Sequence, residues 1–362
     1  MDKKPNRPQK LKDVVSSLDY NKFHKELSDA QYKLGLLQGS QHELGNARLL
    51  ISPLTAKEAT VSSRIEGTQS TVSDVFLLEA GGVPQNSDTI QVKNYRYAMT
   101  FAIDELKKGR KISAYFIKTL HQLLLNGVRH KGRLGEFRKC PVWIAEKEGD
   151  PIEKAIYIPP EFHFVIDYID ELISYINTEQ EQPLVKAGIA HYQFEAVHPF
   201  EDGNGRIGRL LVPLILSNEG VLSEPILYLS GYLDEHRDEY LEALHRVDET
   251  GNYESWLSFY LKSVSYQLSS TQKLIERISK LYSDLKNIDK ARSPYFVHFL
   301  DFIFKVPIFT VPQLRRSIRA ATRVTPKKLI DSFIKRGIIS ERKDRFKRAK
   351  LFSFDPLLNM LK

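Results

Sequence analysis

The chain has 362 residues and a formal net charge of +8 at pH 7. That length suffices for two or three domains with buried cores, and the apolar and charged fractions are those of a water-soluble globular protein. No apolar run approaches the roughly 18 residues that cross a bilayer, and no apolar segment follows the basic first residues as in a secretory signal. A single cysteine, Cys140, excludes an internal disulfide and gives no support for a Cys/His zinc site. We therefore expect a cytoplasmic protein without membrane partners.

Helical patterns fill most of the first 130 residues. Residues 1 to about 12 lack such a pattern, and we expect them to be disordered. Ser and Pro favour the first turn of a helix, and Gly favours the position after its end, so these residues predict helix boundaries. They predict that helices begin at Ser52–Pro53 and, with Ser113 as the N-cap, after Ser113. They predict that helices end near Gly39, Gly67, Gly109 and Gly127.

The pattern changes after residue 135. The runs FRKCPVWI and KAIYIPP show partial alternation and are separated by the charged stretch AEKEGDPIE, which predicts a small β-hairpin. Helical patterns resume at Phe162 and continue to about Leu285, where the last segment is long enough to link two domains. The predicted fold class is mainly α, with one small hairpin in the main domain.

The basic character of the chain belongs to its C-terminal part. Residues 293–362 carry 16 Lys and Arg against 5 Asp and Glu, which suggests a separate unit. TVPQLRRSIR and RVTPKKLIDSFIKRGII predict a helix-turn-helix pair, and SERKDRFKRAKLFSF predicts a strand pair around a charged turn, a wing. The charge is typical of a nucleic-acid binder, although contacts with a protein partner or between subunits remain open.

The stretch HPFEDGNGR, residues 198–206, concentrates polar chemistry between two apolar helical segments. The second helix is predicted to begin near Gly205 or Arg206, and a helix N-terminus offers unpaired N–H groups to an anion. Arg206 and Arg209 are three residues apart, so both project from one face and suit a polyphosphate. Asp202 can hold the magnesium ion that usually accompanies such a ligand.

His198 lies just before this loop. A neutral imidazole, whose ordinary pKa is about 6.5, can accept a proton from an incoming hydroxyl. Phe200 is apolar in a polar loop and is expected to point inward. The sequence has no GxxxxGK[ST] motif, which excludes a Walker-type nucleotide site. Together these residues indicate attack of a hydroxyl on a phosphate of a magnesium-bound nucleotide.

From His198 to Arg209, HPFEDGNGRIGR matches every specified position of HxFx[D/E][G/A]N[G/K]RxxR and so resembles the signature of the Fic (Fido) protein family. GEFRKCPVWI and YIPP resemble the family's flap hairpin, which lies over the active site. SSRIEGT is similar to the inhibitory motif [S/T]xxxE[G/N], whose positions are met by Ser62, Glu66 and Gly67. The resemblance implies the class with an N-terminal inhibitory helix, and the C-terminal part resembles an appended winged-helix domain.

The resemblance also implies a layout. The expected parts are an N-terminal helical region at 1–110 with the inhibitory motif at 62–67, a catalytic core at 111–265 with its flap at 135–160 and its signature at 198–209, a linker helix at 266–292 and a winged-helix domain at 293–362. The implied fold is a Fic-type helical bundle with a small hairpin.

The activity that the resemblance implies is transfer of AMP from ATP, with magnesium, to a Ser, Thr or Tyr hydroxyl of a target protein, the chain itself included, with release of pyrophosphate. The implied roles are general base for His198, magnesium ligand for Asp202, binding of the α- and β-phosphates for Gly203, Asn204, Gly205 and Arg206, and binding of the γ-phosphate for Arg209. Tyr240 is similar to a tyrosine of the nucleotide base site, but a core tyrosine fits equally well.

Two further sets of residues have implied roles. Val142 and Trp143 of the flap either touch a target segment that adds to the hairpin as a strand or belong to the core. Glu66 would pair with Arg209 in the ATP site and misalign the nucleotide. Three alternatives stay open: removal of AMP with Glu66 positioning water, transfer of another nucleotide or phosphate group, and a nucleotide-sensing DNA-binding regulator. A homodimer is a further expectation.

Overall fold

The computed structural model describes residues 4–43, 48–83, 86–147, 149–178, 180–222, 226–288, 295–320, 324–343 and 350–362. Contacts between residues divide the chain into two compact units. Unit 1 consists of Met1–Leu36 and Tyr97–Leu268, and unit 2 consists of Leu37–Arg96 and Ser269–Lys362. The divisions fall within three long helices, α2 (His24–Glu43), α5 (Thr89–Lys107) and α12 (Tyr253–Ile288). No described helix is long and apolar enough to cross a membrane.

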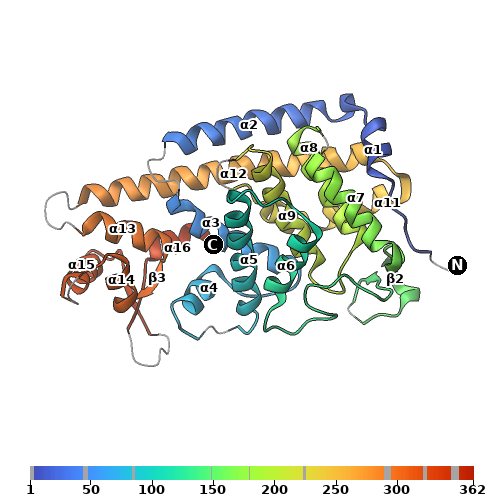
Figure 1. Cartoon of the computed structure of the whole chain (residues 1–362). Helices are drawn as coiled ribbons and strands as arrows, with labels where there is room; N and C mark the ends of the chain where they lie inside the picture. The colour runs from blue at the N-terminus through green and yellow to red at the C-terminus, as the bar shows by residue number, and fades with distance from the viewer. Residues whose placement is uncertain are drawn as a thin grey trace. The chain divides into compact units, whose positions relative to one another are not determined.

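Unit 1 is mainly helical (Figure 1). Besides its shares of α2, α5 and α12, its helices are α1 (Leu11–Ser17), α6 (Ala114–Leu125), α7 (Val165–Thr178), α8 (Pro183–Val197), α9 (Asn204–Asn218), α10 (Ser230–Glu235) and α11 (Arg237–Thr250), with 3-10 turns at Tyr20–Lys22, Ile152–Lys154 and Phe162–Phe164. Helices α8 and α9 pack side by side and are buried along almost their whole length. A helix that is apolar on nearly every face must lie inside the fold, so α8 and α9 form the centre of the unit.

The predicted hairpin is confirmed, but it is short. Strand β1 (Ile144–Ala145) pairs antiparallel with β2 (Ala155–Tyr157), with Ile144 opposite Tyr157 and an irregularity next to it. The predicted first strand was expected to start near Phe137. Phe137 and Arg138 are instead buried without strand structure, because the backbone and guanidinium groups of Arg138 bond to the loop after α8.

The expectation of disorder over residues 1 to about 12 is wrong for the described residues 4–12. The backbone N–H of Asn6 donates to the carbonyl oxygen of Ile158, just after β2, at 2.8 Å. Arg7 forms an ion pair with Glu161 at 2.7 Å. Leu11 is 1% exposed and begins α1. Residues 4–12, the N-terminal strap, are held by single hydrogen bonds and one or two buried side chains. Such contacts leave no periodic pattern in the sequence, so the order of this segment could not be predicted.

Several helix boundaries agree with the sequence and two do not. Gly67, Gly109 and Gly127 all have positive φ two residues after the last residue of a helix, and the hydroxyl of Ser113 accepts a hydrogen bond from the N–H of Phe116 at 3.2 Å. Helix α2 continues through Gly39 to Glu43, and α3 begins before Ser52–Pro53, at Arg48. Pro53 therefore lies inside α3, where its missing N–H costs one backbone bond without ending the helix.

Unit 2 joins segments that are distant in the sequence. It contains α3 (Arg48–Ile65), α4 (Val72–Glu79), α13 (Phe296–Lys305), β3 (Ile308–Thr310), α14 (Val311–Ser317), α15 (Val324–Lys335), β4 (Ser340–Arg342), β5 (Leu351–Ser353) and α16 (Asp355–Leu361). The three strands form an antiparallel sheet in the order β3-β5-β4. Helix α13 packs on α3, α16 contacts α3 and α4, and Ser52 donates a hydrogen bond to the carbonyl of Lys305.

This grouping differs from the layout expected from the sequence, in which residues 1–110 and 293–362 were separate parts. The segment from 37 to 96, with the SSRIEGT motif, shares one core with the basic C-terminal segment. The charge composition suggested a boundary at residue 293, but charged side chains lie mostly on the surface and do not show which segments share a core. The packing depends on the apolar faces of α3 and α13, and the sequence of an apolar face does not show which other helix it contacts.

Candidate active site

The signature loop is a tight connection between two buried helices. His198 caps the end of α8 in the left-handed conformation, with φ 49 and ψ 60, and its N–H donates to the carbonyl of Phe194 at 3.0 Å. Gly203 precedes α9 with φ 79, and the helix begins at Asn204, one residue earlier than predicted. A left-handed conformation is unfavourable for a residue with a side chain and persists where the surroundings impose it. The fold therefore fixes the direction in which His198 leaves α8.

Asn204 holds the loop closed from inside. Its side-chain oxygen accepts from the N–H of Phe200 and its amide nitrogen donates to the carbonyl of Phe200, both at 2.9 Å. Asn204 is 2% exposed and Phe200 is fully buried, as expected for an inward anchor. The amide of Asn204 thus positions the loop backbone, which leaves the phosphate role implied for this residue to its main chain.

His121 of α6, which the sequence did not single out, joins the loop to the base of the flap. Its Nδ1 accepts from the N–H of Gly135 at 3.0 Å and its Nε2 donates to the carbonyl oxygen of Asp202 at 3.1 Å. The two partners fix the neutral tautomer with the proton on Nε2. Burial lowers the pKa of His121 to about 4, which also keeps the ring neutral. The ring stacks on Phe200 with centroids 3.9 Å apart.

Arg138 is a second residue that sequence reasoning missed. Its side chain donates to the carbonyl oxygens of His198 at 2.8 Å, Val197 at 3.2 Å and Pro160 at 2.6 Å. Its own N–H donates to the carbonyl of Pro199 at 2.9 Å. Burial lowers the pKa of this guanidinium, and the carbonyl groups compensate for its lost water. Arg138 therefore fastens both ends of the flap segment to the backbone around His198.

The charged residues of the signature lie at the start of α9. Arg206 and Arg209 are 4% and 3% exposed, whereas the side chain of Asp202 is 32% exposed. Arg206 forms an ion pair with Asp202 at 3.3 Å. Gly208 lies where α9 approaches α8 closely: a Cβ atom there would displace the carboxylate of Glu195 and would lie 3.3 Å from the ring of Phe194. The close contact of α8 and α9 thus brings His198 and both arginines into one region of unit 1.

A backbone carbonyl of α8 orients the His198 ring. Its Nδ1 faces the carbonyl oxygen of Glu195 at 3.4 Å. When Nδ1 carries the proton and donates to this oxygen, Nε2 is the nitrogen that can accept a proton. The His198 side chain is partly exposed, as a group that meets a substrate must be.

Tyr240 lies in the aromatic core. It is 3% exposed, its hydroxyl and Nε2 of the fully buried His191 are 2.9 Å apart, and its ring packs near Trp256 and Phe259. Burial lowers the pKa of His191 to about 4, so this pair is a neutral hydrogen bond. Of the two roles that the sequence left open, these surroundings are those of a core tyrosine.

The flap presents apolar side chains at its surface. Trp143 is 40% exposed, and its indole N–H donates to the carbonyl of Asp150 at 2.7 Å. Val142 is partly exposed, and Ile144 and Ile156 are 39% and 50% exposed. An apolar, partly unpaired hairpin is a surface to which an extended peptide can add as a strand.

The inhibitory motif lies at the end of α3, in unit 2. Ser62 is buried, Glu66 is exposed, and Gly67 ends the helix with φ 93. The N–H of Thr68 donates to the carbonyl of Ser63 at 3.2 Å, which closes the helix end directly beyond Glu66. Arg209 belongs to unit 1, so the expected pair of Glu66 with Arg209 stays a proposal.

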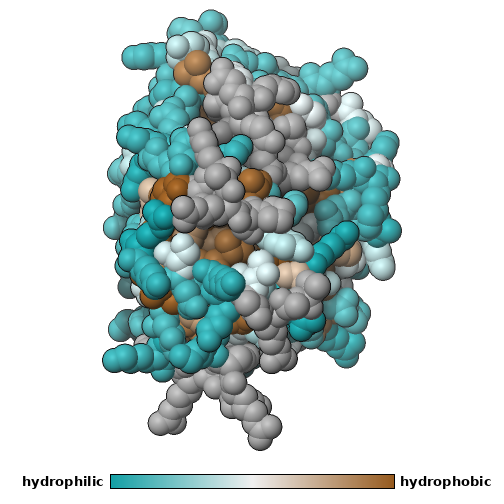
Figure 2. Space-filling model, turned by 90° about the vertical axis from the view of Figure 1, so that its left-hand side faces the viewer, coloured by the Kyte–Doolittle hydropathy of each residue, from teal (hydrophilic) through white to brown (hydrophobic). Residues whose placement is uncertain are grey.

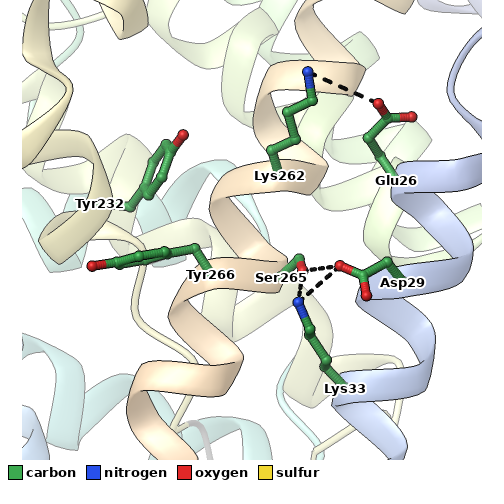
Figure 3. Close-up of a pocket in the computed structure, with 7 residues that line it drawn as sticks. All are labelled: Glu26, Asp29, Lys33, Tyr232, Lys262, Ser265 and Tyr266. Atoms are coloured by element: carbon green, nitrogen blue, oxygen red, sulfur yellow. Dashed lines mark hydrogen bonds and ion pairs between the residues drawn. The ribbon is translucent and has the colours of Figure 1, made fainter.

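A cavity of about 340 Å³ lies elsewhere in unit 1 (Figure 3). Its lining residues are Glu26, Asp29, Lys33, Tyr232, Lys262, Ser265 and Tyr266. Lys33 bonds to Asp29 at 2.9 Å and to Ser265 at 2.6 Å, so the central charges neutralise each other. The cavity contains no signature residue and is not the candidate active site.

Comparison with known proteins decides the family. A family model described as "Fic/DOC family N-terminal" matches residues 24–104, and one described as "Fic/DOC family" matches residues 111–216, which include the flap segment and the whole signature. The chain belongs to the Fic/DOC family. Its mainly helical Fic fold with small sheets is also that of solved relatives.

Curated relatives carry a consistent name. The chain is 32% identical over 159 residues to "Protein adenylyltransferase fic-1" of Caenorhabditis elegans, in a match that covers 43% of this chain and 28% of the relative. It is 33% identical over 96 residues to "Probable protein adenylyltransferase aq_aa38" of Aquifex aeolicus, covering 26% of this chain and 28% of the relative. The chain therefore spans little more than a quarter of the length of these relatives.

Two solved structures show the same fold. A Fic family protein from Desulfovibrio desulfuricans G20 has a TM-score of 0.57 at 19% identity, over 97% of this chain and 98% of that one. Fic-1 (residues 134–508) from C. elegans has a TM-score of 0.51 at 22% identity, over 73% of this chain and 75% of that one. At these identities the likeness concerns the fold alone.

Proposed function

We propose that this Fic protein transfers AMP from ATP to a hydroxyl side chain of a protein. The observation that carries the proposal is the arrangement where α8 ends and α9 begins. There His198, held in the left-handed conformation, precedes Asp202 and two buried arginines. The names of the curated relatives support the same reaction, and the proposal for this chain is argued from its own residues.

Nucleotide binding follows from the start of α9. Its first N–H groups and the guanidiniums of Arg206 and Arg209 suit the phosphates of ATP, since charge-assisted hydrogen bonds to phosphate are strong. The backbone of Gly203, Asn204 and Gly205 lines the same helix start. The loop backbone would keep its conformation when the phosphates bind, because hydrogen bonds of Asn204 and His121 already fix it.

Magnesium fits the donor set. No described group of three or more His, Cys, Asp or Glu side chains could hold a metal alone, and Asp202 is a single, partly exposed carboxylate. Magnesium in nucleotide sites is bound through one or two carboxylates together with substrate phosphates, so Asp202 would hold it there. When bound, the ion neutralises phosphate charge, and Arg206 would then release Asp202 and turn to the phosphates.

His198 supplies the proton transfer. Its Nε2 accepts the proton of the target hydroxyl while the hydroxyl oxygen attacks the α-phosphorus of ATP. The bond from the α-phosphorus to the bridging oxygen breaks, and pyrophosphate leaves. A positioned general base contributes roughly 10²- to 10⁴-fold to such a step. The flap would hold the target segment, with Val142 and Trp143 as side chains that meet it.

Glu66 would restrain this activity. We propose that its carboxylate pairs with Arg209 and so withdraws the partner of the γ-phosphate. Its exposed position just after α3, directly before Gly67, supports the proposal together with the match of Ser62, Glu66 and Gly67 to the inhibitory motif. Removal of AMP, with Glu66 positioning a water molecule, is the competing use of the same residue.

Labelled ATP tests the proposed reaction. Incubation with magnesium and ATP labelled at the α-phosphate should place label on the protein itself or on a protein of a cell lysate. ATP labelled at the γ-phosphate should leave no label. The reverse pattern would establish phosphate transfer, and no label in either arm, with Glu66→Gly included, would contradict the proposal.

A further inference from the structure

The C-terminal part of unit 2 has a helix-turn-helix arrangement with a strand hairpin. Its elements follow the order α13, β3, α14, α15, β4, β5, and β5 lies between β3 and β4 in the sheet. Helices α14 and α15 contact each other, and α14 also contacts α13. Thr310 caps α14 through a reciprocal pair of hydrogen bonds with Gln313. In this arrangement the second helix of the pair is the one free to enter a groove of DNA.

Helix α15 has one buried face and one exposed face. Leu329, Ile330 and Phe333 are buried, and the ring of Phe333 meets that of Phe299 on α13 edge-on, with centroids 4.9 Å apart. The opposite face carries Lys327, Lys328, Asp331 and Lys335, all exposed. Packing against α13 therefore fixes which side chains α15 presents outward.

The surface around this face is strongly basic. Within the described part of residues 295–362, the exposed acidic side chains are Asp331 and Glu341, and Lys350 neutralises Glu341 at 2.8 Å. The exposed cations in the same residues are Lys305, Arg316, Arg319, Lys327, Lys328, Lys335, Arg336, Lys343, Lys350 and Lys362. Such a surplus of positive charge attracts a polyanion.

The chemistry of this face favours nucleic acid over protein. Protein interfaces have an apolar centre with aromatic side chains. In the described residues from 295 onward, the one large apolar side chain with substantial exposure is Val297, at 43%, and it lies on α13. Figure 2 views the side on which α13, α14 and α15 lie in Figure 1, and hydrophilic residues predominate over its described part.

We propose that the exposed face of α15 binds duplex DNA through the major groove. A helix of this kind fits the groove, which is about 12 Å wide. Lys327 and Lys328 can donate to guanine or to phosphates, and Asp331 can accept from the amino group of cytosine. The site is independent of the proposed AMP transfer, because none of its residues belongs to unit 1.

Binding of the full chain to a fluorescent duplex of about 25 base pairs tests the inference. Affinity should fall as salt rises, by a log–log slope of about 0.9 for each phosphate contact. The double variant Lys327→Ala/Lys328→Ala should weaken binding at least tenfold and lower the slope, whereas Lys305→Ala/Lys362→Ala, at exposed positions outside α15, should change affinity less than threefold. Circular dichroism confirms that both variants are folded.

Three outcomes would overturn the inference. They are absence of duplex binding at low salt, equal losses in the two double variants, and equally tight binding of polyglutamate, which would indicate docking of an acidic protein. Labelling from α-labelled ATP should be the same in both double variants and the wild type.

Discussion

The imidazole of His121 donates a hydrogen bond from Nε2 to the backbone oxygen of Asp202, and its other nitrogen accepts from the N–H of Gly135. One neutral ring on α6 therefore joins the signature loop to the base of the flap. Phosphate binding and target binding are therefore expected to depend on it together.

Replacement of His121 tests this positioning role. His121→Phe retains an aromatic ring to stack on Phe200 but loses both hydrogen bonds. We expect at least a tenfold loss of AMP transfer, with KM rising for the target protein more than for ATP, because the flap base loses its hydrogen bond to His121 of α6. Thermal unfolding measured by circular dichroism separates this effect from loss of the fold. A variant with wild-type transfer would show that the bridge has no role in the site.

An isosteric change tests the closure of the signature loop. Asn204→Asp replaces the amide that donates to the carbonyl of Phe200 with an oxygen that repels it. An unmet buried polar group costs about 1–3 kcal/mol, so the melting temperature and ATP affinity should both fall. Asn218→Asp, at the exposed end of the same helix, is the matched control and should change neither. Calorimetric titration with ATP and magnesium measures the affinity, and unchanged binding by Asn204→Asp would contradict the account.

The sequence predicted the signature loop well because its chemistry is local. His198, Asp202 and the two arginines lie within twelve residues, and glycine at position 203 predicts the turn from backbone conformation alone. His121 and Arg138 were missed because their partners in the signature loop, Asp202 and His198, lie 81 and 60 positions away in the sequence. The one feature of the sequence that could have indicated Arg138 was a single arginine next to the apolar Phe137.

Two features of the fold could not be predicted, for the same reason. The N-terminal strap is held by contacts of Asn6 with Ile158 and Asp248, and unit 2 by the packing of α13 on α3. Both depend on which distant segment meets which, and periodicity describes each segment alone. Helix stops such as Gly67 were predicted correctly because they depend on the local backbone.

Asp248 of α11 should make stability depend on pH. Burial raises the pKa of its carboxyl from 3.8 to about 6, although Tyr192 and Asn6 donate hydrogen bonds to it. The folded protein therefore binds this proton more tightly than the unfolded chain. The stabilisation is full below about pH 4, and the free energy of unfolding should decline as the pH rises through about 6. His245 opposes the shift and Glu249 increases it.

Melting temperatures of wild type and Asp248→Asn between about pH 4 and pH 7 check this prediction. The variant should lack the decline and should melt at a higher temperature than wild type at pH 7, because a neutral amide replaces a buried charge. Asp238→Asn, exposed near the start of the same helix, is expected to keep the wild-type slope. Parallel curves for wild type and Asp248→Asn would show that Asp248 does not titrate in this range.

Removal of the Glu66 carboxylate should release the proposed restraint. Glu66→Gly would free Arg209 for the γ-phosphate and raise labelling of the protein and its target severalfold or more. A glycine near a helix end costs about 1 kcal/mol of stability, so the variant should remain folded. Arg209→Ala in the same chain should cancel the gain, since the freed partner is then absent.

The same variant separates transfer from removal of AMP. If Glu66 positions a water molecule, Glu66→Gly should abolish hydrolysis of a target that already carries AMP. If neither transfer nor hydrolysis changes, SSRIEGT is only the end of α3 and the restraint does not exist.

The most direct test of the central proposal is transfer of α-labelled AMP by Glu66→Gly with and without a second change, His198→Ala. Loss of the general base should lower labelling by roughly 10²-fold or more, while ATP binding measured by calorimetry stays within about twofold, because the groups of α9 that are proposed to bind the phosphates are intact. His24→Ala, which alters an exposed histidine at the start of α2, should label like its parent. Undiminished labelling by the His198→Ala protein would contradict the assignment of His198, and with it the proposed reaction at this site.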